Sequence, residues 1–182
     1  DYPIEQLAPG AVNRGVEQCA RHDIGRVHFV THSMGGILVR YFLKHYSLPV
    51  ALGRVVMLSP PNAGSEVADR LADWWLYRWL NGPAGQQLLT GKAGLPDQLG
   101  AVGFPLGVIT GNRHAFFDGW LADMIPGEDD GKVSVNRARV AGMSDFLVVP
   151  YSHAFIMNQP DVIAQVLYFL RYGAFSHVAP SR

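Results

Sequence analysis

One stretch constrains the fold more than any other, residues 25–46 with the sequence GRVHFVTHSMGGILVRYFLKHY. Residues 26–31 form an apolar run of the length of a short buried strand, and residues 35–46 have helical spacing. We expect the inner side of that helix to carry Ile37, Leu38, Tyr41, Phe42 and His45. Only a sharp turn fits between the two segments, so the stretch predicts a strand that passes directly into a helix.

The rest of the chain repeats this alternation. Further strands are predicted at residues 54–59, 105–110 and 145–150, and helical patterns lie within 4–20, 65–80 and 160–172. Pro9 and Gly10 interrupt the first pattern, which leaves open whether that helix begins only after them. The last helix is expected to bury Ile163, Val166, Leu167 and Leu170. We therefore predict a single α/β domain over residues 1–182, with about four parallel strands and helices on both faces of the sheet.

Composition excludes several classes of protein. The chain has 15 basic and 15 acidic residues, so it lacks the basic footprint of a nucleic-acid binder. It has no polybasic run and no apolar stretch long enough to span a bilayer, so we expect no stable membrane insertion. A single cysteine, Cys19, excludes an intramolecular disulfide and fits a reducing compartment such as the cytoplasm. No metal and no cofactor are predicted.

The turn at residues 31–36 has the features of a nucleophile elbow. A strained turn between strand and helix would project the Ser33 hydroxyl above the sheet, and Gly35 and Gly36 would let strand and helix approach closely. The N-terminus of the following helix places partial positive charge where an oxyanion develops, with the N–H of Met34 as one donor. Thr31 departs from the usual pattern, which has glycine two residues before the serine.

A nucleophilic serine needs a base, and the base needs a group that orients it. In the chain order Ser–acid–His, the segment PGEDDGK offers Asp130, with Asp129 as the nearest rival and Asp118 and Asp123 further back. His153 follows the last strand and is the only histidine beyond Asp130 apart from His177 in the tail. We predict Ser33, Asp130 and His153 as catalytic residues.

These motifs together resemble the α/β-hydrolase superfamily, and within it the bacterial lipases and esterases. The resemblance rests on HSMGG, on RVVMLSPPNAGSEVAD after the next strand, on DGKVSV and on SHAF, and it covers nearly the whole chain. It implies that this chain corresponds to the C-terminal half of the family's sheet. The segment at residues 60–65 is expected to line the site and to cap the next helix through Asn62 or Ser65.

In this family the second oxyanion donor comes from a loop upstream of the elbow that often carries a His-Gly pair, and no such pair occurs in this sequence. The elbow strand would then have a bare apolar edge, Val27 to Thr31, that could template pairing with another chain. We therefore expect either a homo-oligomer or a missing N-terminal part that pairs with this strand.

An aromatic run, DWWLYRWL, lies within residues 65–103, which are a candidate cap over the serine. Trp74, Trp75 and His32 are assigned to substrate binding. The expected function is hydrolysis of a small-molecule ester or lipid through an acyl-enzyme. The alternatives are a non-catalytic binding or assembly module on a hydrolase scaffold, and a thioesterase or acyltransferase that uses the same three residues.

Overall fold

The computed structural model describes residues 2–22, 24–71, 83–92, 94–114 and 125–177. Its elements follow the order α1 (Ile4–Arg21), β1 (Arg26–His32), α2 (Met34–His45), β2 (Ala51–Leu58), α3 (Glu66–Leu71), α5 (Leu95–Leu99), β3 (Leu106–Gly111), β4 (Asp145–Val149), η1 (Ile156–Asn158) and α7 (Pro160–Tyr172). The predicted strands and the last helix are confirmed to within a few residues. No helix in the described ranges is long and apolar enough to cross a membrane.

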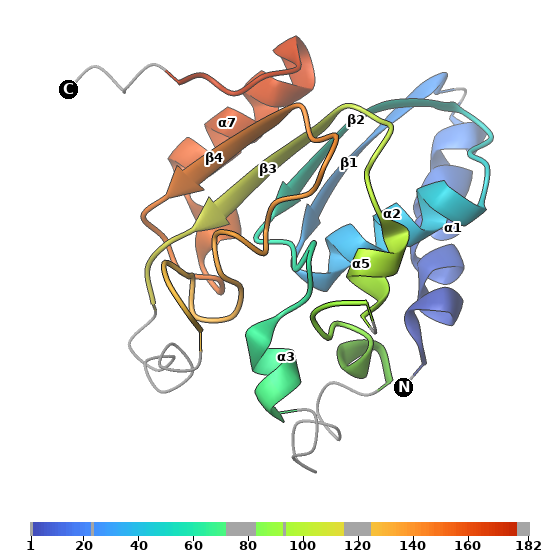
Figure 1. Cartoon of the computed structure of the whole chain (residues 1–182). Helices are drawn as coiled ribbons and strands as arrows, with labels where there is room; N and C mark the ends of the chain where they lie inside the picture. Colours follow the sequence, from blue (N-terminus) through green and yellow to red (C-terminus); the bar gives the residue numbers. More distant parts are fainter. Residues whose placement is uncertain (1, 23, 72–82, 93, 115–124, 178–182) are drawn as a thin grey trace.

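The four strands form one parallel sheet in the order β1-β2-β3-β4 (Figure 1). This confirms the predicted fold class. The carboxyl ends of all four strands lie along the same side of the sheet, so the loops that leave them can share one site.

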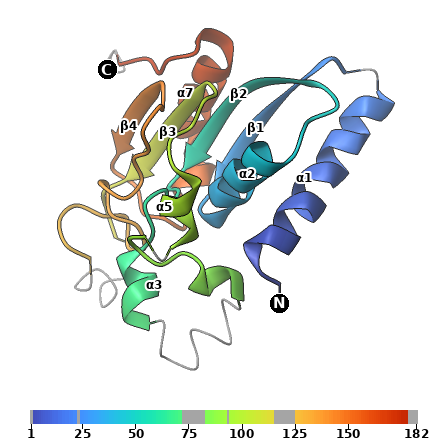
Figure 2. The same cartoon turned by 45° about the vertical axis from the view of Figure 1, so that its right-hand side comes forward.

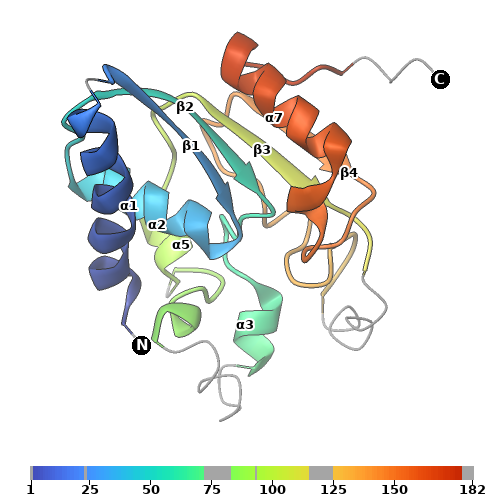
Figure 3. The same ribbon diagram turned by 180° about the vertical axis from the view of Figure 1, so that it is seen from behind.

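Helices cover both faces of the sheet. α1 and α2 lie on one face and α7 lies on the other, as the views from the side and from behind show (Figures 2 and 3). β2 shows why both faces are apolar, since Val55 and Met57 pack in the core beneath α1 and α2 while Val56 and Leu58 pack against α7. A strand buried on both sides reads as a continuous apolar run, which is what the sequence shows here.

α1 runs without a break through Pro9. Ile4, Ala8, Val12 and Val16 are each at most 5% exposed, and they form a single stripe along the helix. Burial of that stripe on both sides of Pro9 outweighs the one backbone hydrogen bond that the proline removes. The helix therefore begins at Ile4, before Pro9 and Gly10.

α7 buries a different stripe from the one predicted. Val162, Val166 and Phe169 are its buried residues, whereas Ile163 and Leu167 are 47% and 63% exposed. The position of Val166 is therefore confirmed and Leu170 is half-buried against the same core, whereas Val162 and Phe169 are buried in addition to these two. α7 has apolar residues at so many positions that either of two neighbouring sides of the helix could be buried. Contact with β2 and β4 selects one of these two sides.

β1 is the edge strand of the described sheet. It pairs with β2 alone, and its residues alternate between half-buried and exposed, with Val30 50% exposed. A hollow of about 430 Å³ lies beside it, bounded by α1, β1 and α2. In the described chain β1 is therefore half-buried rather than buried, and its outer side, Val27 to Thr31, is the unpaired edge expected from the sequence.

Candidate functional site

The turn after β1 carries Ser33 in a strained conformation. Ser33 has φ 53° and ψ −129°, a left-handed backbone that a residue with a side chain adopts only under constraint. Its own N–H donates to Leu58 O at 2.9 Å, which ties the turn to the end of β2. A Cβ on Gly36 would lie 3.0 Å from Met57 Sδ and 3.2 Å from Cβ of Pro60, so glycine lets the helix start this close to β2 without displacing either residue.

Three side chains from distant parts of the chain are hydrogen bonded in series. Ser33 Oγ lies 3.0 Å from His153 Nε2, and His153 Nδ1 lies 3.0 Å from Asp130 Oδ2. Both His153 and Asp130 are almost fully buried, at 3% and 0% exposure. The order hydroxyl, imidazole, carboxylate is the one that activates a serine for nucleophilic attack.

The backbone holds the carboxylate of Asp130 in place. Its Oδ1 accepts hydrogen bonds from the N–H groups of Lys132 (3.1 Å) and Val133 (2.9 Å), and its carbonyl accepts one from His153 N (2.8 Å). Burial acts to raise the pKa of Asp130, but the bond to His153, the charge of His153 and the Ser59 hydroxyl together bring that pKa below its ordinary value. The group is therefore a carboxylate at neutral pH.

Ser59 ends the strand next to the elbow and was not predicted as part of the site. It is fully buried, and its φ of 47° makes it the second residue other than glycine with a left-handed backbone in the described chain. The Ser59 hydroxyl has no well-formed hydrogen bond to a described residue, and it contributes to lowering the pKa of Asp130. Nothing in the local sequence LSPPN marks this position, whose N–H donates to Ile109 O of the neighbouring β3 at 2.8 Å.

Asp129, the rival of Asp130, faces a different partner. Its Oδ1 lies 2.9 Å from His114 Nε2 and accepts the N–H of Gly131 at 2.7 Å. Burial raises the pKa of Asp129, and these two contacts oppose that rise. Asp129 thus shapes the loop in which Asp130 sits, while Asp118 and Asp123 lie outside the described residues.

Of the remaining predicted site residues, Met34 and His32 lie in the part of the chain that the structure describes. Met34 begins α2, so its backbone N–H has no partner within the helix and lies at the helix N-terminus beside Ser33. His32 Nε2 lies 2.9 Å from the carbonyl oxygen of His153. Trp74, Trp75 and the rest of residues 72–82 of the candidate cap lie outside the described residues.

The segment at residues 60–65 holds the site's surroundings together, partly as predicted. Ser65 caps α3 by accepting Ala68 N at 3.4 Å, and its hydroxyl donates to Lys132 O at 2.9 Å. Asn62 instead accepts hydrogen bonds from the buried Arg40 and donates to Ala138 O. The segment that follows Asp130 is therefore tied, at Lys132 and at Ala138, to the loop that follows β2.

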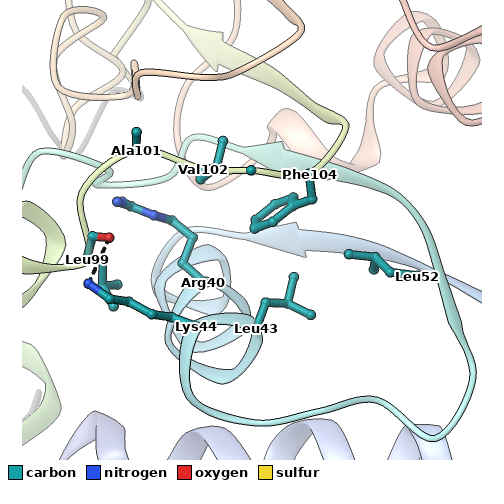
Figure 4. A pocket seen from close by; sticks show the side chains of 9 residues that line it. Arg40, Leu43, Lys44, Leu52, Leu99, Ala101, Val102 and Phe104 are labelled. Atoms are coloured by element: carbon teal, nitrogen blue, oxygen red, sulfur yellow. Dashed lines mark hydrogen bonds between the residues drawn. The ribbon is translucent and has the colours of Figure 1, made fainter.

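A second hollow, of about 390 Å³, lies between α2 and the amino ends of β2 and β3 (Figure 4), whereas Ser33 follows the carboxyl end of β1. Arg40 and Lys44 stand at one end of it, and Leu43, Leu52 and Phe104 line the other. Arg40 donates to Pro96 O and Gly100 O, and Lys44 donates to Gln98 O and Leu99 O. Both cations thus bind carbonyls at the C-terminal end of α5, which is a structural role.

Comparison with known proteins identifies the fold. No protein-family model matches this chain, and no curated protein does. Among solved structures, a bacterial lipase and an archaeal carboxylesterase have a similar α/β-hydrolase-like fold.

Two of the similar structures are of one lipase. The mature form of lipase BlEst2 from Bacillus licheniformis superposes with a TM-score of 0.74 at 24% identity, covering 93% of this chain and 75% of that one. Its propeptide form gives a TM-score of 0.76 at 23% identity and covers all of this chain but 43% of that one. Phospholipase PlaB from Legionella pneumophila gives 0.66 at 19% identity, over 93% of this chain and 48% of that one. The chain therefore spans 75% of the mature lipase, but less than half of its propeptide form and of the phospholipase.

Proposed function

We propose that this protein is a serine hydrolase that cleaves carboxylic esters, with Ser33 as nucleophile, His153 as base and Asp130 as the residue that orients the base. The observation that carries the proposal is the pair of 3.0 Å contacts that join the three side chains at the start of α2. The similar fold of proteins named lipase and phospholipase supports it.

The chemistry follows from the order of these groups. His153 Nδ1–H donates to Asp130, which leaves Nε2 free to accept the proton of the Ser33 hydroxyl. The Ser33 oxygen forms a bond to the ester carbonyl carbon, and the carbonyl oxygen becomes an oxyanion facing the N–H of Met34. His153 then gives its proton to the departing alcohol. Water, deprotonated by His153, attacks the acyl carbon, the bond to the Ser33 oxygen breaks as His153 returns the proton to it, and the acid is released.

Burial supports the assignment of His153 as the base. At 3% exposure its ring is shielded from bulk water, so its two hydrogen bonds act in a medium of low dielectric constant. The imidazolium that forms during the reaction lies against an ionised carboxylate, and this attraction lowers the barrier to proton transfer.

A panel of nitrophenyl esters tests the proposal on the full-length protein. Hydrolysis is expected for one or more acyl lengths between acetate and palmitate, and Ser33→Ala is expected to lower kcat at least roughly 1,000-fold. The control is Ser47→Ala, which removes a hydroxyl from an exposed serine. Turnover of thioesters in preference to esters would point to the thioesterase alternative, and equal rates for Ser33→Ala and the wild type would contradict the proposal.

We also propose that a further strand pairs with the open side of β1, from a second copy of the chain or from a segment upstream of Asp1. The bare apolar edge and the hollow beside it support this pairing. Hydrogen exchange of β1 amides that do not bind β2 is expected to be slow in the full-length protein. Protection that grows with protein concentration would indicate a second copy, protection independent of concentration an upstream strand, and fast exchange would contradict the proposal.

A further inference from the structure

His32 binds the backbone of the residue that we propose as the base. It is the last residue of β1, directly before Ser33, and its Nε2 lies 2.9 Å from the carbonyl oxygen of His153. A carbonyl only accepts, so Nε2 of His32 must carry the hydrogen. The two imidazole rings are in contact, with centroids 4.8 Å apart and planes tilted by 51°.

With this contact, the backbone of His153 is hydrogen bonded on both sides of its Cα. The N–H of His153 donates to Asp130 O at 2.8 Å, and its carbonyl accepts from His32. The backbone of His153 is thus fixed by one residue adjacent to the nucleophile and by the residue that holds the ring. Any shift of His153 away from Ser33 would break one of these two bonds.

We propose that His32 is a positioning residue for the reaction, whose Nε2–H keeps His153 within reach of Ser33 by holding the His153 carbonyl. The inference rests on the proposed function, because it takes His153 to be the base. It gives His32 a role in place of the substrate binding expected from the sequence. A displacement of about 1 Å between base and nucleophile is enough to cost roughly 100-fold in rate.

The charge state of His32 suits this role. Burial and the nearby His153 lower the pKa of His32, whereas its bond to the His153 carbonyl and the charge of Asp130 act in the opposite direction and Lys132 lowers it slightly further. His32 is therefore neutral at pH 7. When His153 accepts the proton of Ser33, the neighbouring ring adds no like charge that would oppose the transfer.

Two variants separate the hydrogen bond from the ring. His32→Phe keeps a ring and removes the donor, whereas His32→Gln keeps a donor near the position of Nε2 and removes the ring. Kinetics are measured on the full-length protein with the preferred nitrophenyl ester, and rates are counted per serine that a fluorophosphonate labels. Melting temperatures of both variants are recorded beside the wild type.

We expect His32→Phe to lower kcat roughly 10- to 100-fold with KM changed less than about twofold. His32→Gln should recover most of that loss, to within about fivefold of the wild type. A merely structural role would change the melting temperature and the labelled fraction but leave kcat per labelled serine unaltered.

Three results would overturn the inference. These are a wild-type kcat in folded His32→Phe, a raised KM at unchanged kcat in either variant, and a folded His32→Gln as slow as His32→Phe. If His32→Phe does not fold, His32→Gln still decides, because a folded but inactive amide variant excludes the hydrogen bond as the cause. Absence of labelling at Ser33 in the wild type would instead contradict the proposed function itself.

Discussion

Ser33 Oγ and His153 Nε2 lie 3.0 Å apart although 120 residues separate them in the chain. The strands that these residues follow are not neighbours, because Ser33 follows β1 and His153 follows β4, at opposite edges of the described sheet. Three strand spacings amount to roughly 14 Å. The loop after β4 must therefore cross the ends of β3 and β2, and it passes Asp130 on the way.

The two neighbouring carboxylates should differ sharply in their effect on activity. Asp130→Asn keeps the shape of the side chain but removes the charge that orients and stabilises His153, so we expect kcat to fall roughly 1,000- to 10,000-fold. Asp129→Asn changes a group that faces His114 and Gly131, and should leave kcat within about threefold. Steady-state kinetics on both variants decide, and a greater loss for Asp129→Asn would exchange the two assignments.

The lowered pKa of Asp130 predicts a pH dependence of stability. Between its ordinary pKa of about 4 and its lower value in the folded protein, the unfolded chain binds more protons, so stability rises with pH in this window. The stabilisation is complete above pH about 4 and is lost as the pH falls through the folded value. Urea unfolding at pH 7 and near pH 3 should show a smaller loss for Asp130→Asn than for the wild type. An equal loss in both proteins would show that Asp130 does not contribute.

Gly111, the last residue of β3, makes room for the site. A Cβ there would lie 2.0 Å from Tyr151 O and 3.0 Å from the Asp130 Cβ, which belong to the loops that hold His153 and Asp130. Gly111→Ala is expected to destabilise the fold by roughly 1–3 kcal/mol and to lower kcat, because Asp130 and the His153 loop must move apart. Gly10→Ala is the control, since nothing lies within 4 Å of its Cβ position in α1. Unfolding curves and kcat are measured for both, and unchanged values for Gly111→Ala would contradict the packing.

Arg40 should stabilise the fold without taking part in the chemistry. Its buried guanidinium donates to four oxygens in two segments, the loop after β2 and α5 with its C-cap, and burial lowers its pKa to about 10. Arg40→Met would leave those carbonyls without partners, for a loss of about 3 kcal/mol. Lys44→Met, at the exposed neighbouring position, should cost less than about 1 kcal/mol. Denaturant unfolding of the two variants checks the contrast, which would fail if both lost the same amount.

The sequence predicted the three linked residues because each stands in a pattern tied to its place. Ser33 lies between a strand and a helix, Asp130 precedes a glycine after the third strand, and His153 follows the fourth. Strand boundaries could be predicted for the same reason, since apolar runs in a doubly covered sheet are continuous.

Other features depend on contacts between distant segments and left no local pattern. Arg40 lies on the buried side of α2 because the carbonyls of Asn62, Pro96 and Gly100 surround it, whereas His45, expected inside, is exposed. The bond from His32 to the His153 carbonyl likewise depends on the path of a loop 121 residues away. Spacing along one helix or strand does not encode such partners.

Active-site labelling is the sharpest test of whether Ser33 is a nucleophile that His153 activates. The full-length protein is treated with a fluorophosphonate at neutral pH, and the modified peptide is located by mass spectrometry. We expect one label, on Ser33. Labelling should be absent in Ser33→Ala and much slower in His153→Ala. A folded, active protein that carries no label on Ser33, or that is labelled as fast without His153, would contradict this assignment.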